Sequence, residues 1–142
     1  MSGTAFAGPE QSPGFVLWRA TLVWQRRITA ALDPFGLTHV QFVLLACAWW
    51  LSRDEAPRQA DVAAQAGTDP VMTSEVLRRL ETKGLVRRTT DPSDGRARLI
   101  EVTAEGLRLA ELAVAAVEGV DGDVLGEVDA HVLDRLTAIA GL

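Results

Sequence analysis

Apolar residues at helical spacing predict two helices in the first third of the chain. Residues 14–33 give one stripe along a helix, formed by Leu17, Thr21, Trp24, Ile28 and Leu32. Asp33-Pro34 and Gly36 are expected to end this helix. Thr38 is the expected N-cap of a second helix within residues 39–54. The second helix is apolar on nearly all sides, so we expect it to be buried by several neighbours.

The next two periodic segments are short and lie close together. Residues 58–66 predict a helix that Gly67 closes, and Asp69 then caps a helix that begins at Pro70. Gly84 is the expected stop of this second helix, and its core side consists of Val76, Leu77 and Leu80. Two helices joined by a few residues around a glycine indicate a helix-turn-helix.

A β-hairpin and two further helices complete the pattern. The β-prone segments 85–90 and 96–103 flank turn residues Pro92, Asp94 and Gly95. Beyond them, residues 104–120 and 123–142 each carry an apolar stripe, and Gly119 and Gly122 are expected to separate the two helices. The stripes are Leu107, Ala110, Val114 and Val117, then Leu125, Val128, Val132, Leu136 and Ile139. The predicted fold is mainly α with a small β-hairpin wing, a winged helix-turn-helix flanked by N- and C-terminal helices.

Charge changes the picture, because the acidic chain contains a basic middle. The 142 residues include 14 Lys and Arg and 19 Asp and Glu, a net charge of −5. Residues 104–142 hold eight acids and two bases, whereas residues 73–98 hold seven bases and four acids. Four of these bases, Arg87, Arg88, Arg96 and Arg98, surround one short turn. The net charge of the whole chain therefore conceals this basic segment.

Composition points to a soluble, cytoplasmic protein. Residues 1–13 are expected to form a flexible lead-in without the pattern of a signal peptide, and no segment is apolar enough for a membrane span. The single Cys47 allows no internal disulfide, which suits a reducing compartment. His39 and His131 are isolated in sequence, so we expect no metal site.

Four segments in this order resemble the MarR family of bacterial transcription regulators. They are "FGLTHVQFVLL", "SEVLRRLETKGLVRR", "DPSDGRARLIEVT" and "TAEG", and together with their surroundings they cover about residues 14–140. The resemblance implies a DNA-binding region at 37–103. It also implies dimerisation helices at 14–36 and 104–142, which would form a two-fold homodimer on an inverted-repeat operator.

The residue types at the helix-turn-helix fit binding to double-stranded DNA. The N-terminal half of a recognition helix reaches base edges in the major groove. There Thr73 and Ser74 are candidate hydrogen-bonding residues, and Pro70, Val71 and Met72 are candidate contacts for thymine methyls. Arg78 and Arg79, one turn on, suit phosphates. Family members often have Arg where Glu75 stands, so either the base preference differs or Glu75 faces away.

On the wing, Arg96 is the candidate for a minor groove and Arg98 for a second contact, because narrow grooves attract arginine. The resemblance implies that Asp94 orients Arg96 or Arg98 by ion pairing. At most one of Arg87 and Arg88 is expected to face DNA, since adjacent strand residues point to opposite faces. An arginine-rich hairpin is by itself usually a solvated surface, but the preceding helix-turn-helix favours DNA contact.

The resemblance also implies release from DNA by a small aromatic or phenolic effector. Trp24, His39 and Phe42 are the candidate lining residues, although aromatic residues at helical spacing are more often core. The family's peroxide sensors use a Cys near the start of the first helix, and here the only cysteine is Cys47, in an apolar helix.

The sequence is less typical of two other classes of protein, an enzyme and a protein-binding adaptor. The sequence has no P-loop, dinucleotide-binding glycine turn, HExxH or catalytic triad pattern, so we expect neither an enzyme nor a cofactor. The alternative is a winged-helix adaptor that contacts only proteins. Its wing would be expected to carry exposed apolar anchors rather than arginines.

Overall fold

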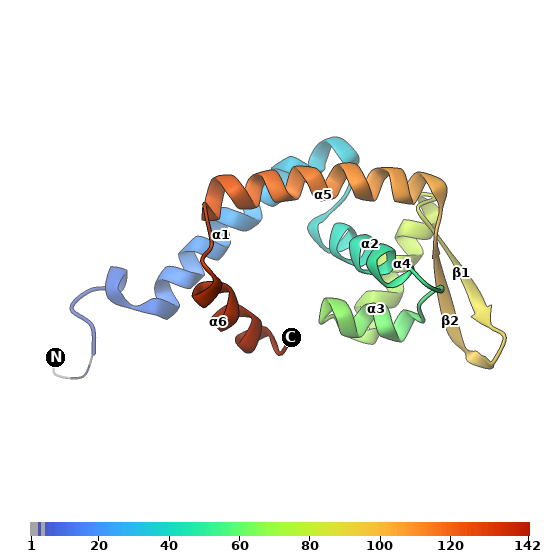
Figure 1. Ribbon diagram of the computed structural model, residues 1–142, viewed down its shortest axis with the longest axis horizontal. Coiled ribbons are helices and arrows are strands. Elements are labelled where there is room, and N and C mark those ends of the chain that lie inside the picture. The colour runs from blue at the N-terminus through green and yellow to red at the C-terminus, as the bar shows by residue number, and fades with distance from the viewer. Residues whose placement is uncertain (1–2, 4) are drawn as a thin grey trace.

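The order of helices and strands is the predicted one as far as the wing. The computed structural model describes residue 3 and residues 5–142. Its elements are η1 (Pro9–Gln11), α1 (Pro13–Leu32), η2 (Asp33–Phe35), α2 (His39–Leu51), α3 (Gln59–Ala66), α4 (Pro70–Thr82), β1 (Val86–Asp91), β2 (Asp94–Val102), α5 (Ala104–Leu125) and α6 (Ala130–Ala140). Helices α2, α3 and α4 form a cluster from which the β1–β2 hairpin projects (Figure 1).

The predicted caps of α2, α3 and α4 are confirmed by their hydrogen bonds and backbone geometry. Thr38 Oγ1 accepts from the backbone N–H of Gln41, and the Gln41 side chain accepts from the N–H of Thr38. Asp69 accepts from the N–H of Met72 at the start of α4. Gly67 has a φ of 71°, which ends α3 in a left-handed conformation that favours glycine. Local caps therefore fix the turn between α3 and α4.

The core lies between α2, the helix-turn-helix, the base of the wing and α5. Helix α2 is buried along most of its length, as its uniformly apolar sequence predicted. Fully buried side chains of α2, α3, α4 and β2 meet there: Leu44, Leu45, Val62, Leu77, Leu80 and Ile100. One shared apolar core thus holds α2, α3, α4 and the base of the wing together.

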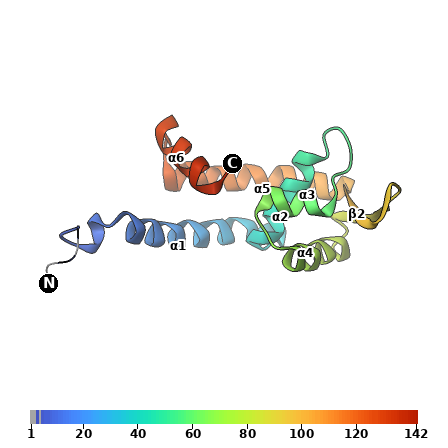
Figure 2. The same ribbon diagram turned by 90° about the horizontal axis from the view of Figure 1, so that it is seen from below.

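Helix α5 links the winged helix to the N-terminal helix. It passes above α2 and continues beside α1, as the two views in Figures 1 and 2 show. Ala110 and Ala113 face the core near its start, and Val117 and Val120 are buried further along. On α1 only Ile28 and Leu32, in the C-terminal half, are buried. The N-terminal half of α1 and all of α6 leave apolar side chains exposed.

The predicted break at Gly119 and Gly122 is wrong. Helix α5 runs through both glycines without interruption and ends at Leu125, where Gly126 has a φ of 63°. A glycine inside a helix costs only about 0.5–1 kcal/mol, which the packing of a long helix can offset. Leu125 consequently belongs to α5 and Val128 to the connection, so the predicted stripe of the last helix is divided.

At the N-terminus, Pro9–Gln11 form one turn of 3-10 helix inside the predicted lead-in. The flexibility of that lead-in stays a prediction, and residues 1, 2 and 4 of it lie outside the described residues. No single helix of the described chain is long and apolar enough to cross a membrane, although α1 with η2 and α2 pass that test as a pair bent by 73°.

Candidate nucleic-acid interface

Helix α4 turns one face to the core and the opposite face to solvent. Val76, Leu77 and Leu80 are buried, as predicted. Val71, Glu75 and Arg78 follow one another at helical spacing on the solvent side, and the Val71 side chain is 78% exposed. Pro70 and Met72 are also exposed, and Ser74 is half-buried. Most of the predicted recognition residues are therefore accessible.

Thr73 requires a correction, because it is fully buried. Its hydroxyl donates to the carbonyl oxygen of Asp69 at 2.7 Å, and Thr68 Oγ1 lies 2.7 Å away on the other side. Since Thr73 has one hydroxyl proton, Thr68 must donate to it. Thr73 therefore stabilises the turn of the helix-turn-helix and does not reach a base.

The two arginines of α4 differ in their partners. Arg79 Nη2 lies 3.0 Å from Glu75 Oε1, an exposed pair one helical turn apart. Among the described residues Arg78 has no acidic partner, and it is exposed beside Val71. A cation without a partner on the solvent face of a helix is free to meet a phosphate.

On the wing, Arg96 and Arg98 are exposed, and neither is ion-paired within the described chain. The predicted ion pair with Asp94 is wrong. Asp94 Oδ1 instead accepts from the backbone N–H of Arg96 at 3.0 Å. Such a bond two residues along the chain holds the backbone in a turn, so Asp94 shapes the tip of the wing and leaves both guanidinium groups free.

Arg87 and Arg88 serve the fold. Arg88 is 17% exposed, and its backbone N–H and Nε both point to the Glu81 carboxylate at the end of α4. Arg87 Nε lies 3.9 Å from Glu101, its partner across the antiparallel ladder. Both arginines that the sequence left undecided are thus paired with acids at the base of the wing.

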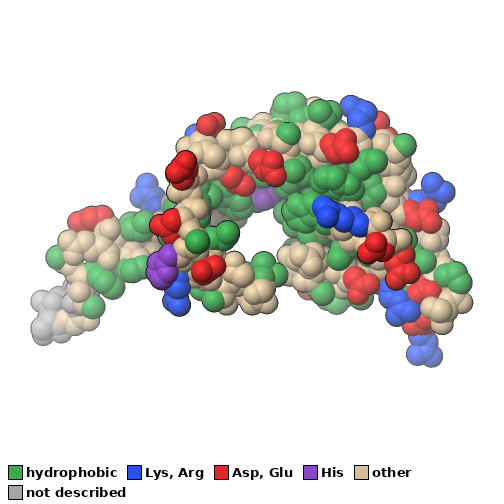
Figure 3. All heavy atoms as spheres, in the orientation of Figure 1, with side chains coloured by type: hydrophobic (Ala, Val, Ile, Leu, Met, Phe, Trp, Pro, Cys, Tyr) green, Lys and Arg blue, Asp and Glu red, His purple; other side chains and the backbone are tan. Residues whose placement is uncertain are grey.

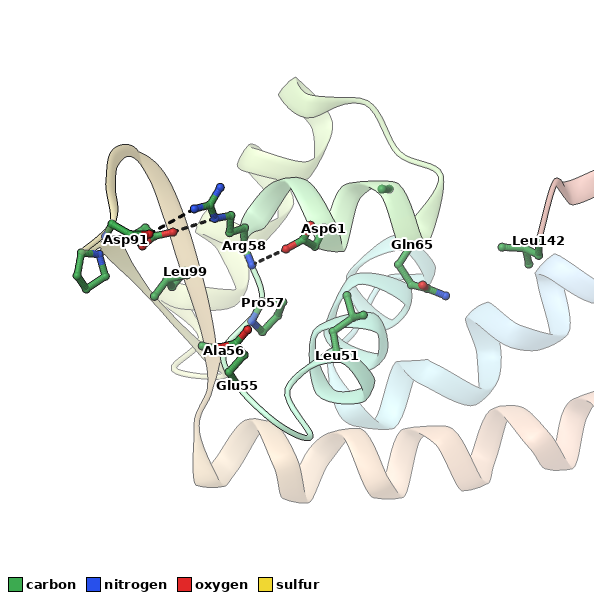
Figure 4. A pocket seen from close by; sticks show the side chains of 13 residues that line it. Leu51, Glu55, Ala56, Pro57, Arg58, Asp61, Gln65, Asp91, Leu99 and Leu142 are labelled. Atoms are coloured by element: carbon green, nitrogen blue, oxygen red, sulfur yellow. Dashed lines mark hydrogen bonds and ion pairs between the residues drawn. The ribbon is translucent and has the colours of Figure 1, made fainter.

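Sequence reasoning missed the residue that ties the wing to the helix-turn-helix. Arg58 Nε lies 2.8 Å from Asp91 Oδ2, and Asp91 is buried (Figure 4). The backbone supports the same contact: Ile100 N–H donates to Pro57 at 2.8 Å, and Arg58 forms a bridge with Leu99. The only local signal was Asp61, which accepts from the N–H of Arg58 at the start of α3.

The Asp91 carboxylate is stabilised from two sides. The backbone N–H and hydroxyl of Ser93 both donate to its Oδ1 at 2.8 Å, and with Arg58 they lower the pKa of Asp91 against the opposing effect of burial. The pair borders an open groove of about 880 Å³ between α3 and the wing. A charged Asp91 therefore fastens the wing where the hairpin turns.

A second groove separates the wing from the helices. It has a volume of about 460 Å³ and lies between Ala60, Ala63 and Pro70 on the helical side and Asp94 to Arg98 on the wing. Arg96 and Arg98 form its outer wall. Figure 3 shows basic side chains projecting at the wing end of the molecule. A groove bounded by cations next to a helix N-terminus suits a phosphodiester strand.

Two of the three predicted effector residues, Trp24 and His39, meet where α1, α2 and α5 join. Trp24 Nε1 donates to Asp121 at 2.7 Å, and the Trp24 and His39 rings meet edge to face with centroids 5.2 Å apart. Burial lowers the pKa of His39, and the negative charge of Asp121 partly opposes this. Phe42 is 8% exposed and belongs to the core cluster. Burial also raises the pKa of Cys47, which keeps its thiol protonated.

Comparisons with known proteins agree with this geometry. The MarR family model matches residues 37–97. An HTH-type transcriptional regulator of Bacillus subtilis, YdcH, is 44% identical over 117 residues, which span 82% of this chain and 80% of YdcH. The HTH-type transcriptional repressor Rv2887 of Mycobacterium tuberculosis is 38% identical over 125 residues, 88% of this chain and 82% of Rv2887.

Solved structures give the same result. The crystal structure of CouR from Rhodococcus jostii RHA1, bound to p-coumaroyl-CoA, matches with a TM-score of 0.83 and 34% identity and covers 95% of this chain and 96% of CouR. The comparisons identify a DNA-binding transcription regulator rather than an enzyme. With the winged helix-turn-helix and its exposed arginines, they show that the chain belongs to the MarR family.

Proposed function

We propose that the protein represses transcription by binding an inverted-repeat operator as a homodimer, with α4 in the major groove and Arg96 in the minor groove. One observation carries the proposal. Arg78 on α4 and Arg96 and Arg98 on the wing are exposed and lack acidic partners among the described residues, whereas Arg87 and Arg88 at the wing base are ion-paired. Rv2887, a relative named as a repressor, supports the sign of the regulation.

In the major groove, the N-terminal half of α4 contacts bases. Val71 and Met72 are exposed and apolar, which suits thymine methyl groups, and Pro70 lies beside them. The Ser74 hydroxyl is the remaining polar candidate now that Thr73 is buried. Arg78 and Arg79 lie beyond the N-terminal half of α4, which contacts the bases, and they bind phosphates of the DNA backbone.

The wing contacts the neighbouring minor groove. Arg96 is held at the tip by the Asp94 turn, and the Arg58–Asp91 pair fixes the hairpin relative to α3. Narrow A·T-rich grooves concentrate negative potential, so an arginine held in place reads groove shape. Arg98 binds a phosphate across the groove that separates wing and helices.

The homodimer forms through α1, α5 and α6. Helix α6 has no buried residue, and its apolar side chains include Val132, Leu133 and Ile139, the last 73% exposed. The N-terminal half of α1 exposes Leu17 and Trp18 in the same way. In Figure 3 an opening lies beneath α5, between α6 and the winged helix. A second copy would cover these apolar surfaces and place two α4 helices about 34–36 Å apart.

A small aromatic effector controls binding at the junction of α1, α2 and α5. Trp24 and His39 offer an aromatic edge and a ring nitrogen there, with Asp121 alongside. CouR, which was solved with p-coumaroyl-CoA, supports a phenolic ligand. The protein acts in the cytoplasm, where its operators are.

Fluorescence anisotropy on fragments of the source genome tests DNA binding. Three phosphate contacts per protomer, six per dimer, predict that affinity falls about 10³-fold between about 50 and 200 mM salt. A control duplex of scrambled sequence separates specific from general binding. No binding at the lower salt concentration would overturn the proposal and favour the protein-contact adaptor.

A further inference from the structure

We propose that Glu75 determines specificity by accepting a hydrogen bond from the 4-amino group of a cytosine in each operator half-site. This inference rests on the proposed placement of α4 in the major groove. It assigns a role to the one acidic side chain on the solvent face of the recognition helix. An acid at that position would otherwise weaken binding to a polyanion.

The position of Glu75 is that of a base reader. It follows Val71 by four residues and precedes Arg78 by three, so it lies on the stripe opposite the buried Val76, Leu77 and Leu80. With Val71, Ser74 and Arg78 it borders a shallow depression of about 410 Å³ on the exposed side of the helix. Its side chain is 51% exposed. If α4 enters the major groove by this face, Glu75 cannot avoid the base edges.

The chemistry of a carboxylate selects among those edges. An ionised Glu only accepts hydrogen bonds. Guanine presents two acceptors in the major groove and thymine one, whereas adenine presents a donor beside an acceptor. Cytosine presents its amino group as a donor without an acceptor of its own. Cytosine is therefore the base that meets the carboxylate without repulsion.

Arg79 allows Glu75 to approach the bases although the DNA phosphates repel a carboxylate. Its Nη2 lies 3.0 Å from Glu75 Oε1, and within the described chain Oε2 has no hydrogen-bond partner. One carboxylate oxygen is thus held by the guanidinium while the other is available to an amino group. The Arg79 charge also offsets that of Glu75, which limits its repulsion from the backbone.

A competing explanation is that the pair only stabilises the exposed surface of α4. In that case removal of the Glu75 charge would raise affinity by a similar factor for every DNA sequence. Base recognition instead predicts an effect confined to one base pair in each half-site. The two explanations therefore differ in sequence dependence and not only in affinity.

Selection from a random duplex library separates them. Bound duplexes are selected and sequenced separately for four proteins. These are the wild type, Glu75→Gln, Glu75→Ala and the control Glu111→Gln. Glu111 is exposed on α5, outside the recognition helix and the wing, and undergoes the same change of charge. Circular dichroism and thermal unfolding establish that all four proteins are folded.

The wild type and Glu111→Gln should enrich the same motif, with a conserved cytosine in each half-site. Glu75→Gln should change this cytosine to adenine, which a Gln amide contacts through two hydrogen bonds, and Glu75→Ala should abolish the preference at that position alone. Replacing the C·G pair with T·A should weaken the wild type by about 5- to 150-fold and leave Glu75→Ala nearly unchanged.

A motif that is identical in wild type and Glu75→Ala overturns the inference, even if affinity rises uniformly. A wild type that enriches no motif overturns the proposed function as well. The two failures are therefore distinguishable in one experiment.

Discussion

At the scale of single residues, the arginines of the winged helix divide by what they contact. Arg58 and Arg88 hold buried or half-buried acids and so fasten the wing to the helices. Arg96 and Arg98 meet no acid within the described residues and project at the hairpin tip. Charged groups held by the fold add stability, whereas free ones add attraction for an anion. The same residue type thus serves two purposes between Arg58 and Arg98.

Arg96→Ala should weaken binding to an operator fragment by about tenfold or more, the equivalent of ~1.4 kcal/mol, because one minor-groove contact per protomer is lost. Anisotropy titrations measure this effect. Arg53→Ala, at an exposed arginine in the loop after α2, is the matched control and should leave affinity unchanged, because Arg53 lies outside the recognition helix, the wing and the proposed dimer helices. Equal affinities for wild type and Arg96→Ala would mean that the wing is only a solvated hairpin.

His39 should make stability depend on pH. Burial lowers its pKa in the folded protein, so the unfolded chain binds the proton more readily. The contribution of His39 to the free energy of unfolding should therefore be greatest above about pH 6.5. It should decline as the pH falls from there toward the lower pKa of the folded protein. Urea unfolding at several pH values measures it. His39→Gln should flatten this part of the profile.

Four residues show what could be predicted from the sequence at this scale and what could not. The positions of Arg78 and Arg96 followed from helix period and turn chemistry. Thr73 was expected at a base because hydroxyls bind bases, but its burial depends on the angle between α3 and α4. Asp94 was expected to pair with a guanidinium, but a backbone N–H two residues away is nearer and needs no side-chain ordering. Packing between two helices decided the case of Thr73, and local backbone geometry decided that of Asp94.

At the scale of elements, the first turn of α5 fixes the direction in which the long helix leaves the wing. The backbone of Gly106 packs against Leu85, whose carbonyl also accepts from the N–H of Thr103. A Cβ at Gly106 would lie 1.9 Å from that carbonyl oxygen. Only glycine allows the helix to approach the strand so closely.

Gly106→Ala should lower the free energy of unfolding by at least about 1–3 kcal/mol, because the added methyl group displaces backbone. Gly119→Ala lies in the same helix with nothing within 4 Å of its added Cβ, and it should stabilise by about 0.5–1 kcal/mol. Denaturant unfolding at one protein concentration compares them. Equal stability of the two variants would contradict the close approach.

Elements with strong local signals were predictable, and those that depend on distant partners were not. The caps at Thr38 and Asp69 and the hairpin turn at Pro92 are contained in a few neighbouring residues. The continuity of α5 through Gly119 depends on packing against α1 and α2, which a local rule does not include. The pairing of Arg58 with Leu99 joins segments 41 residues apart in the sequence numbering and has no periodic pattern to announce it.

At the scale of the whole molecule, charge and apolar surface lie at different places. Helix α6 and the C-terminal half of α5, which carry most of the acidic residues of these two helices, lie toward the end opposite the wing (Figure 1), and basic side chains project at the wing end (Figure 3). Exposed apolar side chains follow α1 and α6 instead. An unpartnered apolar face of this extent marks a surface for association. In the proposed function, the end with the exposed apolar side chains forms the dimer and the wing end binds DNA, with α5 joining the two.

Hydroxyl-radical footprinting of an enriched operator fragment directly tests whether the protein binds DNA as a two-fold dimer. Binding of this kind predicts two protected segments related by two-fold symmetry. Their centres should lie one helical turn, about 10–10.5 base pairs, or a multiple of it apart. Each should be flanked by protection of the adjacent minor groove, which Arg96→Ala removes. A single protected segment, or protection without symmetry, would contradict binding as a two-fold dimer through α4 and the wing.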